Sequence, residues 1–375
     1  MEKDTIRIVI SGGGTGGHIF PAVSIANALK EKYSNAEILF VGAEGRMEMQ
    51  RVPAAGYRII GLPICGLDRK NLLKNFIVIY KIVKSQWMAY KLLKEFRPHV
   101  AVGVGGYASG PTLKTAAMMG IPTLIQEQNS YAGVTNKLLA KSASRICVAY
   151  EGMERFFPKE KIILTGNPIR QGLMNKDITH DEAVRSFGFD PQKRTILIIG
   201  GSLGARTINE SVLGHLDLIK ESGVQFIWQT GKFYHKEILE RLNRHEKLPM
   251  LYVTDFISKM EQAYAAADLV ISRAGAGSIS EFCVLQKPVI LVPSPNVAED
   301  HQTKNALALV NKQAALYVKD GEASDSLLQT AVSTVFEDDL LKELSKNIAT
   351  LAFTNSAEVI ADEVYRLAEK QRLGK

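Results

Sequence analysis

Two glycine-rich segments have the residue types that hold an anionic group. Residues 11–18 (Ser-Gly-Gly-Gly-Thr-Gly-Gly-His) and 200–205 (Gly-Gly-Ser-Leu-Gly-Ala) each follow a short β-branched run. Glycines let backbone N–H groups approach an anion where the positive end of a helix begins. Phosphate or pyrophosphate is therefore the expected ligand, and the Ser202 hydroxyl can donate a hydrogen bond to it. A tight turn without a ligand is the alternative, although so many adjacent glycines would weaken a purely structural turn.

His18 is the candidate general base. It begins the helix expected after the first glycine segment, and an imidazole with an unperturbed pKa near ~6.5 suits proton removal at neutral pH. Capping of the helix or contact with a phosphate is its alternative role.

A dinucleotide site is a second interpretation of the first segment. Gly12, Gly14 and Gly17 satisfy the spacing G-x-G-x-x-G, and Glu44 follows the next expected strand. An NAD-dependent oxidoreductase would have one such loop and a catalytic domain of different composition. The chain has two glycine loops in two similar halves, which disfavours an NAD-dependent oxidoreductase.

The glycine loops need parallel sheets to position them. In both halves, short β-branched runs alternate with longer amphipathic stretches, which is typical of right-handed βαβ units. The expected strands of the first half are residues 7–10, 38–41, 100–104, 123–125, 145–148 and 162–164. Those of the second half are residues 195–199, 225–228, 251–253, 269–272, 289–292 and 315–318.

The fold class expected from these strands is α/β, with two doubly wound Rossmann-like domains. Open parallel sheets bind ligands at the carboxyl ends of their strands, so two such sheets would face each other across a cleft. The chain is expected to cross over at residues 165–168, because Gly166 and the residue before Pro168 interrupt regular structure.

The final helix, expected over residues 356–373, follows the last strand and is expected to pack back on the first domain. The predicted domains are therefore residues 1–167 with 356–375 and residues 168–355.

Composition narrows the functional classes. The 375 residues, 46% apolar and 23% charged, supply enough material for two cores. Three cysteines without a C-x-x-C pair indicate neither a disulfide framework nor a zinc site and fit a reducing cytosol. No secretory signal is expected, and no apolar run approaches the ~20 residues that span a bilayer. The net charge of +7 favours anionic partners, but no nucleic-acid motif accompanies it.

Eight motifs resemble those of one family. In the first half they are GGGTGGHIFPA (12–22), GGYASGP (105–111), EQNSYAGVTNK (127–137) and TGNPIR (165–170). In the second half they are GGSLGAR (200–206), QTGK (229–232), SRAGAGSISE (272–281) and PSPNVAEDHQTKNA (293–306). Together they resemble the MurG family, bacterial enzymes that move N-acetylglucosamine from UDP-N-acetylglucosamine onto the undecaprenyl-pyrophosphoryl muramyl-pentapeptide precursor of peptidoglycan. The resemblance covers nearly the whole chain.

The resemblance implies an inverting hexosyltransferase of the glycosyltransferase-B fold, held peripherally at the cytoplasmic face of the bacterial cell membrane. It also implies that the domain of residues 1–167 with 356–375 faces the acceptor and the membrane, and that residues 168–355 bind the donor. Its role would lie in cell-wall biogenesis, cell shape and cell division. The alternatives that remain are a transferase of the same fold with another lipid or small-molecule acceptor, and a non-catalytic UDP-sugar sensor or membrane scaffold.

The resemblance also implies donor contacts in both halves. The expected donor-binding residues are Thr15, Gly16, Gly17, Asn129, Arg170, Ser202, Ile257, Glu281 and Gln302. Glu281 would hold the ribose, Gln302 would contact the sugar hydroxyls, and Ile257 would line the uracil pocket unless it is only a core residue. Arg170 would clamp the diphosphate through its planar guanidinium.

The expected reaction is a single displacement that produces a β-1,4 linkage. Glu127 is the rival of His18 for removing the proton of the muramyl 4-hydroxyl, and the choice between them is open. Gln126 stands where the family often has histidine, so no imidazole is available there. No D-x-D pair occurs in these motifs, so no metal cofactor is expected, and backbone amides and Arg would neutralise the departing UDP.

A basic segment suggests how the chain meets a lipid acceptor. Residues 69–97 hold eight basic residues against one acid, Glu95. On a helix, the buried face is expected to hold Phe76, Ile79, Val83, Trp87 and Tyr90. The face expected at an anionic membrane holds Lys74, Ile77, Lys81, Lys84 and Met88, with Leu92 beside them. A merely solvated basic face is the alternative.

Overall fold

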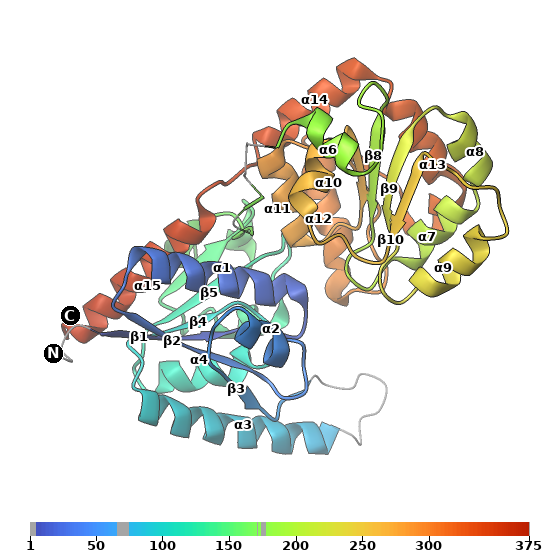
Figure 1. Cartoon of the computed structure of the whole chain (residues 1–375). Coiled ribbons are helices and arrows are strands. Elements are labelled where there is room, and N and C mark those ends of the chain that lie inside the picture. The colour runs from blue at the N-terminus through green and yellow to red at the C-terminus, as the bar shows by residue number, and fades with distance from the viewer. Residues whose placement is uncertain (1–4, 66–74, 171, 174–177, 375) are drawn as a thin grey trace. The chain divides into compact units, whose positions relative to one another are not determined.

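The computed structural model describes residues 5–65, 75–170, 172–173 and 178–374. It divides into two compact units, one formed by the chain up to Arg170 together with the chain from Thr354, the other by Gln171–Phe353. The predicted crossing points, after residue 167 and before residue 356, lie close to these limits (Figure 1).

Unit 1 is built on a seven-stranded parallel sheet with the order β3-β2-β1-β4-β5-β6-β7. Its strands are β1 Ile6–Ser11, β2 Ala36–Ala43, β3 Ile59–Leu62, β4 Val100–Gly103, β5 Thr123–Glu127, β6 Arg145–Val148 and β7 Ile162–Leu164. Its helices are α1 Gly16–Lys32, α2 Glu48–Ala54, α3 Asn75–Phe96, α4 Ser109–Met118, α5 Val134–Leu139 and α15 Ser356–Arg372.

Unit 2 is built on a six-stranded parallel sheet with the order β10-β9-β8-β11-β12-β13. Its strands are β8 Thr195–Ile199, β9 Gln225–Gln229, β10 Leu251–Thr254, β11 Leu269–Ser272, β12 Val289–Leu291 and β13 Leu316–Tyr317. Its helices are α6 His180–Ser186, α7 Arg206–Leu213, α8 Leu216–Glu221, α9 His235–Leu242, α10 Met260–Ala266, α11 Ala276–Leu285, α12 His301–Val310, α13 Ala323–Thr334 and α14 Asp338–Ala349.

Both sheets reverse their strand order at the strand that precedes a glycine loop. β1 lies between β2 and β4, and β8 lies between β9 and β11. Ligands of open parallel sheets bind at this switch point, outside the carboxyl ends of the strands. The prediction of two doubly wound α/β domains is therefore confirmed, and each glycine loop lies where its sheet is expected to bind a ligand.

The sequence pattern does not predict strand β3. β3 is a four-residue edge strand that pairs with β2 and is interrupted by Gly61. Its β-branched run consists of only two residues, Ile59 and Ile60. Pro63 comes directly after the last residue of the strand. Such a short run gives too little alternation to distinguish an edge strand from a loop.

Helix α15 completes the core of unit 1, as the sequence predicts for the final helix. Its residues Ile360, Ala361, Val364 and Ala368 are buried in one cluster with α1 and strands of the sheet. The Tyr365 ring stacks on Tyr33, which follows α1, with 3.7 Å between ring centroids. This packing explains why residues so far apart in sequence belong to one unit.

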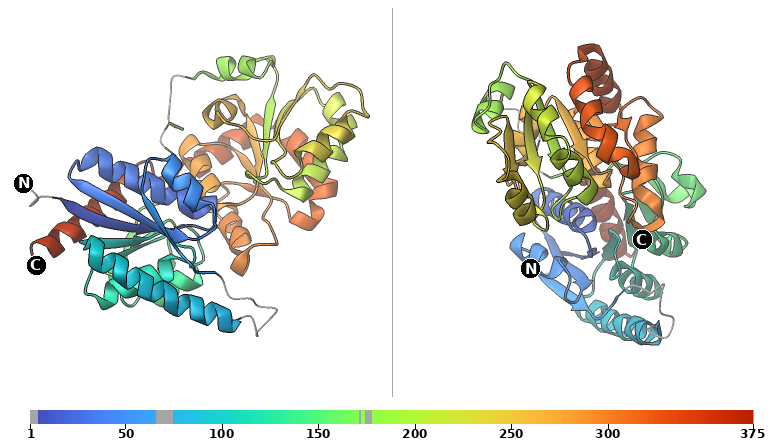
Figure 2. Two further views of the ribbon diagram at one scale, coloured as in Figure 1. Left: turned by 60° about the horizontal axis from the view of Figure 1, so that its bottom comes forward. Right: turned by 90° about the vertical axis from the view of Figure 1, so that its right-hand side faces the viewer.

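Helix α3 runs along the outside of unit 1 (Figure 2). The face that it turns inward differs from the predicted one. The prediction that Ile79, Val83, Trp87 and Tyr90 are buried is wrong, because these four side chains are 45–60% exposed. The face that packs inward contains the buried residues Val78, Ser85, Ala89, Leu92 and Leu93.

Close packing explains this choice of face. Helix α3 packs against α4, and its buried face includes the small residues Ser85 and Ala89. Small side chains let two helices approach closely, and close approach increases the number of dispersion contacts. The prediction that Leu92 and Met88 lie among the exposed lysines is also wrong, since Leu92 is buried and Met88 packs against the core. Lys84 is exposed and Lys81 is half-buried.

The side chains of three residues of the two predicted faces lie outside the described part of the structure. Lys74 lies outside the described residues, and so do the side chains of Ile77 and Phe76.

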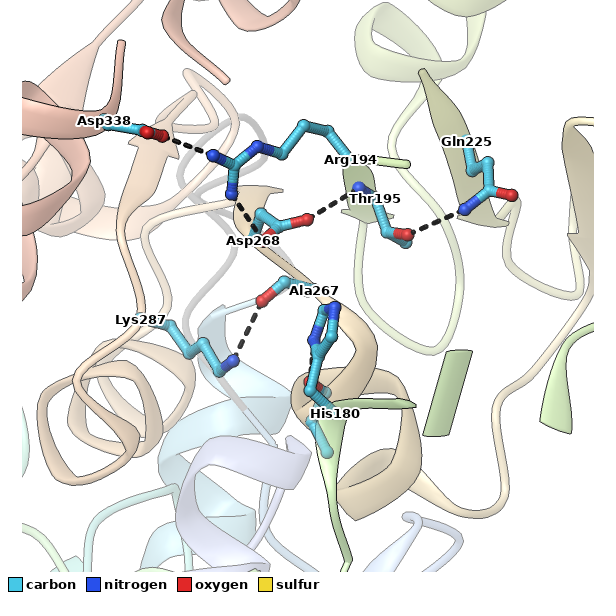
Figure 3. Close-up of polar contacts among 9 residues, drawn as sticks. His180, Arg194, Thr195, Gln225, Ala267, Asp268, Lys287 and Asp338 are labelled. Atoms are coloured by element: carbon cyan, nitrogen blue, oxygen red, sulfur yellow. Dashed lines mark hydrogen bonds and ion pairs between the residues drawn. The ribbon is translucent and has the colours of Figure 1, made fainter. Parts of the chain in front are cut away.

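An ion-pair network holds the amino edge of the unit 2 sheet (Figure 3). The Asp268 carboxylate, just before β11, accepts the backbone N–H of Thr195 at 2.8 Å and the Arg194 guanidinium at 3.2 Å. The same guanidinium pairs with Asp338 of α14. These contacts tie the starts of two neighbouring strands to a covering helix, at the edge opposite the glycine loop.

Lys287 lies in the same region, directly before β12. Its ammonium group is enclosed and donates to the Ala267 carbonyl at 2.8 Å. Burial lowers the pKa of Lys287 to about 8, and the neighbouring Asp268 offsets part of this effect. The folded unit therefore loses this proton at a lower pH than the unfolded chain does.

This difference predicts a pH effect on stability. Between about pH 8 and the ordinary lysine range near ~10.4, the unfolded state binds more protons, so Lys287 makes the fold more stable as the pH rises. We expect the unfolding free energy of wild type, relative to Lys287→Met, to rise by about 2 kcal/mol over this window. Calorimetric unfolding across pH 7 to 10 measures it. Lys342→Met, at a side chain that is 77% exposed, should follow wild type, and equal pH slopes in all three proteins would contradict the assignment.

Candidate active site

The first glycine loop connects β1 to α1 and brings Thr15, Gly16, Gly17 and His18 together. Thr15 is the N-cap of α1, and Gly16 and Gly17 form the start of the helix. Their backbone N–H groups therefore belong to the positive end of a 17-residue helix. This is a suitable place for a phosphate group.

The His18 ring is held by the loop itself. Nδ1 lies 3.0 Å from the carbonyl oxygen of Gly13 and 3.4 Å from the Thr15 hydroxyl. A carbonyl oxygen can only accept, so Nδ1 is the nitrogen that carries the proton, and in the neutral ring Nε2 carries the lone pair. This tautomer is the one that a base acting through Nε2 requires.

The GGYASGP segment lines the other side of the His18 ring. A Cβ atom at Gly105 would lie 2.7 Å from Cδ2 and 2.8 Å from Nε2 of His18, so the imidazole lies directly against this backbone. Ser109, the first residue of α4, donates to the Ser11 or the Gly105 carbonyl, each at 2.8 Å. The loops after β1 and β4 are thereby joined at the sheet's switch point.

Glu127, at the end of β5, has both carboxylate oxygens engaged. Oε1 accepts the backbone and side-chain N–H groups of Asn129, at 3.1 and 3.3 Å. Oε2 accepts the backbone N–H of Gly133 at 2.9 Å and the amide of Asn136 at 2.8 Å. The residue is 1% exposed. Its contacts organise the loop between β5 and α5.

Gln126 supports the crossing segment in place of a histidine. Its amide nitrogen donates to Asn167 Oδ1 at 2.9 Å, and Asn167 donates to the Gln128 carbonyl at 3.0 Å. Both Gln126 and Asn167 are buried. This amide network connects β5 to the segment that leads to Arg170, whose side chain is half-buried.

In unit 2, Gln229 ties the second glycine loop to the expected uracil pocket. Its Nε2 donates to the Gly201 carbonyl and its Oε1 accepts the backbone N–H of Ile257, both at 3.1 Å. Ile257 is 6% exposed, whereas Phe256 beside it is 44% exposed, and Ser202 is exposed in the loop. The phenyl ring of Phe256 is therefore more available for contact with a uracil ring than the side chain of Ile257 is.

Glu281 lies in the middle of α11, the helix that follows the carboxyl end of β11. It is 7% exposed, and its Oε2 accepts the Tyr264 hydroxyl at 2.8 Å. The helix begins with the small residues Ala276 and Gly277 after the N-cap Gly275. A ligand at this helix end would meet backbone N–H groups first and the carboxylate behind them.

Gln302 lies in the first turn of α12. Its Oε1 accepts the backbone N–H of Ser294 at 2.8 Å, and among the described residues its Nε2 has no hydrogen-bond partner. Glu299 and Asp300, just before the helix, both adopt positive φ, 59° and 49°. Such strained backbone is commonly found at ligand sites, and here it precedes the amide expected to contact the sugar.

The expected site residues thus fall into two groups, each at the carboxyl ends of one sheet. Unit 1 holds the first glycine loop, His18, Glu127 and Asn129, and unit 2 holds Ser202, Ile257, Glu281 and Gln302. In the described part of the chain, no cluster of three or more His, Cys, Asp or Glu side chains is arranged to hold a metal ion. No helix in that part is both long and apolar enough to cross a membrane.

Comparison with known proteins identifies the chain's relatives. Residues 8–148 match the model of the glycosyltransferase family 28 N-terminal domain, and residues 195–364 match that of its C-terminal domain. A protein of Phocaeicola vulgatus named UDP-N-acetylglucosamine--N-acetylmuramyl-(pentapeptide) pyrophosphoryl-undecaprenol N-acetylglucosamine transferase is 73% identical over 99% of this chain and 98% of its own. The crystal structure of Acinetobacter baumannii MurG superposes with a TM-score of 0.75 and 26% identity, over 96% of this chain and 99% of that one.

The chain belongs to the MurG family of glycosyltransferases. The same transferase name is carried by a relative from Cytophaga hutchinsonii that is 53% identical over 99% of both chains. The predicted glycosyltransferase-B fold class is confirmed, and the NAD-dependent oxidoreductase alternative is wrong, because both halves match glycosyltransferase domains.

Two residues of this MurG family member were not singled out from the sequence. Glu48 accepts the N–H of Gly14 in the first glycine loop, and Gln229 holds the second loop as described above. Gln229 begins the QTGK motif, so its place at a strand end could have drawn attention to it. Glu48 begins an ordinary amphipathic helix, and no spacing pattern marks it.

Proposed function

We propose that the chain transfers N-acetylglucosamine from UDP-N-acetylglucosamine to the 4-hydroxyl of the lipid-linked N-acetylmuramyl-pentapeptide, the step that converts lipid I to lipid II. The observation that carries this conclusion is the 73% identity, over almost the full length of both chains, to a transferase named for these substrates. Relatives from 53% to 73% identity carry the same name, and this disfavours the alternative acceptors.

His18 is the base in the proposed mechanism. Its Nδ1–H is committed to the Gly13 carbonyl, so Nε2 is the atom that takes the proton from the muramyl hydroxyl. Glu127 serves instead to shape its loop, because four N–H groups already surround its two oxygens. A carboxylate so engaged would have to break hydrogen bonds before it could accept a proton.

The departing UDP is stabilised by donors rather than by a required cation. We expect the N–H groups at the starts of α7 and α11 and the Ser202 hydroxyl to bind the diphosphate, and Arg170 to contribute a positive charge. In the proposed complex the Gln302 amide contacts the sugar hydroxyls through Nε2, since its Oε1 accepts the Ser294 N–H. Attack from the opposite side of the anomeric carbon then inverts it and forms the β-1,4 linkage.

A turnover assay tests this function. Folded protein, UDP-N-acetylglucosamine and a short-chain lipid-linked muramyl-pentapeptide should release UDP and form the disaccharide in equal amounts. Release of UDP must depend strictly on the acceptor. Absence of both products would overturn the proposal, and UDP release without acceptor would indicate another activity.

The ribose contact makes a separate prediction. Glu281→Ala should weaken UDP binding by roughly 10- to 100-fold, the loss expected for a hydrogen bond to a charged group, while kcat at saturating donor changes little because the contact is remote from the reacting bond. Isothermal titration with UDP measures the affinity. Tyr264→Phe removes only the hydroxyl that binds Glu281 and should retain most of the affinity. Equal losses in both variants would mean that Glu281 acts only through Tyr264.

The same proposal places the protein peripherally at the cytoplasmic face of the cell membrane, through the outer face of α3. We define this outer face as Ile79, Tyr80, Val83, Trp87 and Tyr90, all of which are 45–65% exposed. A row of large exposed apolar side chains on one helix is unusual for a surface that meets only water. It suits insertion into the interfacial region of a bilayer.

Exposed lysines accompany the aromatic rings of this outer face. The Lys91 ammonium lies 3.7 Å from the centroid of Trp87, and the Lys94 ammonium lies 5.9 Å from that of Tyr90. Lys84 is exposed on the same helix. Each lysine near an anionic leaflet adds about 1 kcal/mol, so charge and apolar contact together support reversible binding next to the lipid-linked acceptor.

A further inference from the structure

Glu48, the first residue of α2, is a buried carboxylate bound to the glycine-rich loop. It is 1% exposed. Its Oε2 accepts the backbone N–H of Gly14 at 2.8 Å, and its Oε1 accepts that of Ala43, the last residue of β2, at 3.0 Å. Within the described residues it forms no ion pair with a basic side chain. The carboxylate therefore depends on these two backbone donors.

The surrounding backbone is shaped to fit this carboxylate. A Cβ atom at Gly13 would lie 2.1 Å from Glu48 Oε1, and one at Gly42 would lie 2.6 Å from its Cγ. Only glycine leaves room at these two positions. Because a buried carboxylate is costly unless its oxygens are hydrogen-bonded, a role in fixing the loop explains this arrangement better than a contribution to stability does.

One peptide unit connects Glu48 to His18. The N–H that Glu48 accepts and the carbonyl that binds His18 Nδ1 both belong to the peptide bond between Gly13 and Gly14. In a planar trans peptide these two groups point in opposite directions. Fixing the N–H therefore fixes the direction of the carbonyl, in a loop where Gly14 adopts a φ of 85° and glycines permit many other conformations.

We propose that Glu48 is a positioning residue for the transfer reaction: through the Gly13–Gly14 peptide it holds His18 in the tautomer that leaves the lone pair on Nε2. The inference rests on the proposed function of His18 as the base. The carboxylate also polarises the peptide, which strengthens the carbonyl as an acceptor for Nδ1–H. Glu48 itself touches neither substrate nor reacting atoms.

Glu48→Gln tests this role with almost no change of shape. The Gln amide offers one oxygen acceptor, so its NH2 group must face one of the two backbone N–H donors, and one hydrogen bond is lost. We expect kcat to fall by roughly 10- to 100-fold, as for a slightly misplaced catalytic group, and the pH profile of kcat to change. In the variant, the ring nitrogen NMR signals of His18 should shift from the Nδ1–H tautomer toward a mixture.

Asp268→Asn is the matched control. Asp268 also accepts a backbone N–H, that of Thr195, but at the amino edge of the unit 2 sheet. This variant should lose comparable thermal stability and leave the His18 signals and the pH profile unchanged. The proposal is overturned if the His18 signals and the pH profile of Glu48→Gln are the same as in wild type. It is also overturned if Asp268→Asn alters the signals and the profile as much as Glu48→Gln does.

The spectra are recorded on 15N-histidine-labelled full-length protein without substrates, and His18→Asn identifies the signal. They therefore report on the Glu48 contact even if the transfer assay yields no product, which keeps failure of the two proposals apart. Should Glu48→Gln not fold, Glu48→Asp provides the same test, because it keeps the charge and shortens the reach by one methylene group.

Discussion

Replacement of His18 by alanine is expected to lower kcat by ~100-fold or more while the affinity for UDP stays close to that of wild type, as for the loss of a positioned base. The UDP site is expected mainly in unit 2, so it does not require the imidazole. Steady-state turnover with saturating donor, together with titration of UDP, measures both quantities.

A second substitution separates proton removal from support of the loop. His18→Asn keeps an N–H that can donate to the Gly13 carbonyl, the partner of Nδ1 at 3.0 Å, but has no basic nitrogen. We expect it to be as slow as the alanine variant. Turnover near the wild-type rate in His18→Asn would assign His18 to loop support, and turnover near that rate in both variants would move the base to Glu127.

The second large effect concerns membrane binding. Replacing Ile79, Val83 and Trp87 of the α3 outer face by serine should weaken binding to anionic vesicles by roughly 100-fold or more, because each large apolar side chain contributes about 1.5–3 kcal/mol when fully buried. Vesicle sedimentation measures the bound fraction. Turnover with a short-chain acceptor that is soluble in water should stay near wild type.

A matched control and a charge variant complete this test. Phe336→Ser in unit 2 removes a side chain that is 55% exposed, against 56% for Trp87, and should bind vesicles as wild type does. Lys84, Lys91 and Lys94 changed to Glu should abolish the dependence on anionic lipid and on salt. Unchanged vesicle binding by the serine triple variant would reject the α3 outer face as the membrane contact.

The sheets were predictable from the sequence because strands buried on both faces have continuous apolar runs. Residues 195–199 and 269–272 were expected and observed as strands with the same bounds. Loop positions then followed from topology, since glycines after β1 and β8 can only lie at the carboxyl ends of those strands. β3 was missed because two β-branched residues before a glycine carry no such pattern.

The orientation of α3 could not be predicted from periodicity. An amphipathic pattern shows that a helix has distinct faces, but α3 has apolar residues on two of them, and the choice depends on the partner. The small residues Ser85 and Ala89 are on the buried face of α3, which packs against α4, and Trp87 and Tyr90 are exposed. Hydrophobicity alone predicts burial of the more apolar face, but it does not account for how closely each face can pack against a neighbouring helix.

The sequence predicts those site residues that stand in recognisable motifs. It does not predict a role that depends on one particular hydrogen bond in the folded protein. His18 and Glu127 both stand in recognisable motifs, yet only the hydrogen bonds of Glu127 distinguish a loop-organising carboxylate from a candidate base. Glu48 acts on the loop through a contact between residues 34 positions apart. Such long-range contacts depend on the tertiary fold and leave no local signature.

The return of α15 to unit 1 has a consequence for synthesis on the ribosome. Domains usually begin to fold as they emerge, at roughly 5–20 residues per second. Unit 1 cannot do so completely, because Ile360 and Val364 fill its core beside Ile25 and Leu29 of α1, and they are translated only after all of unit 2. For roughly ten seconds or more, the nascent first unit must therefore expose an apolar groove along α1. Chaperones that bind apolar segments have this interval in which to act, and a ribosome that stalls within unit 2 would leave a product unable to close its own core.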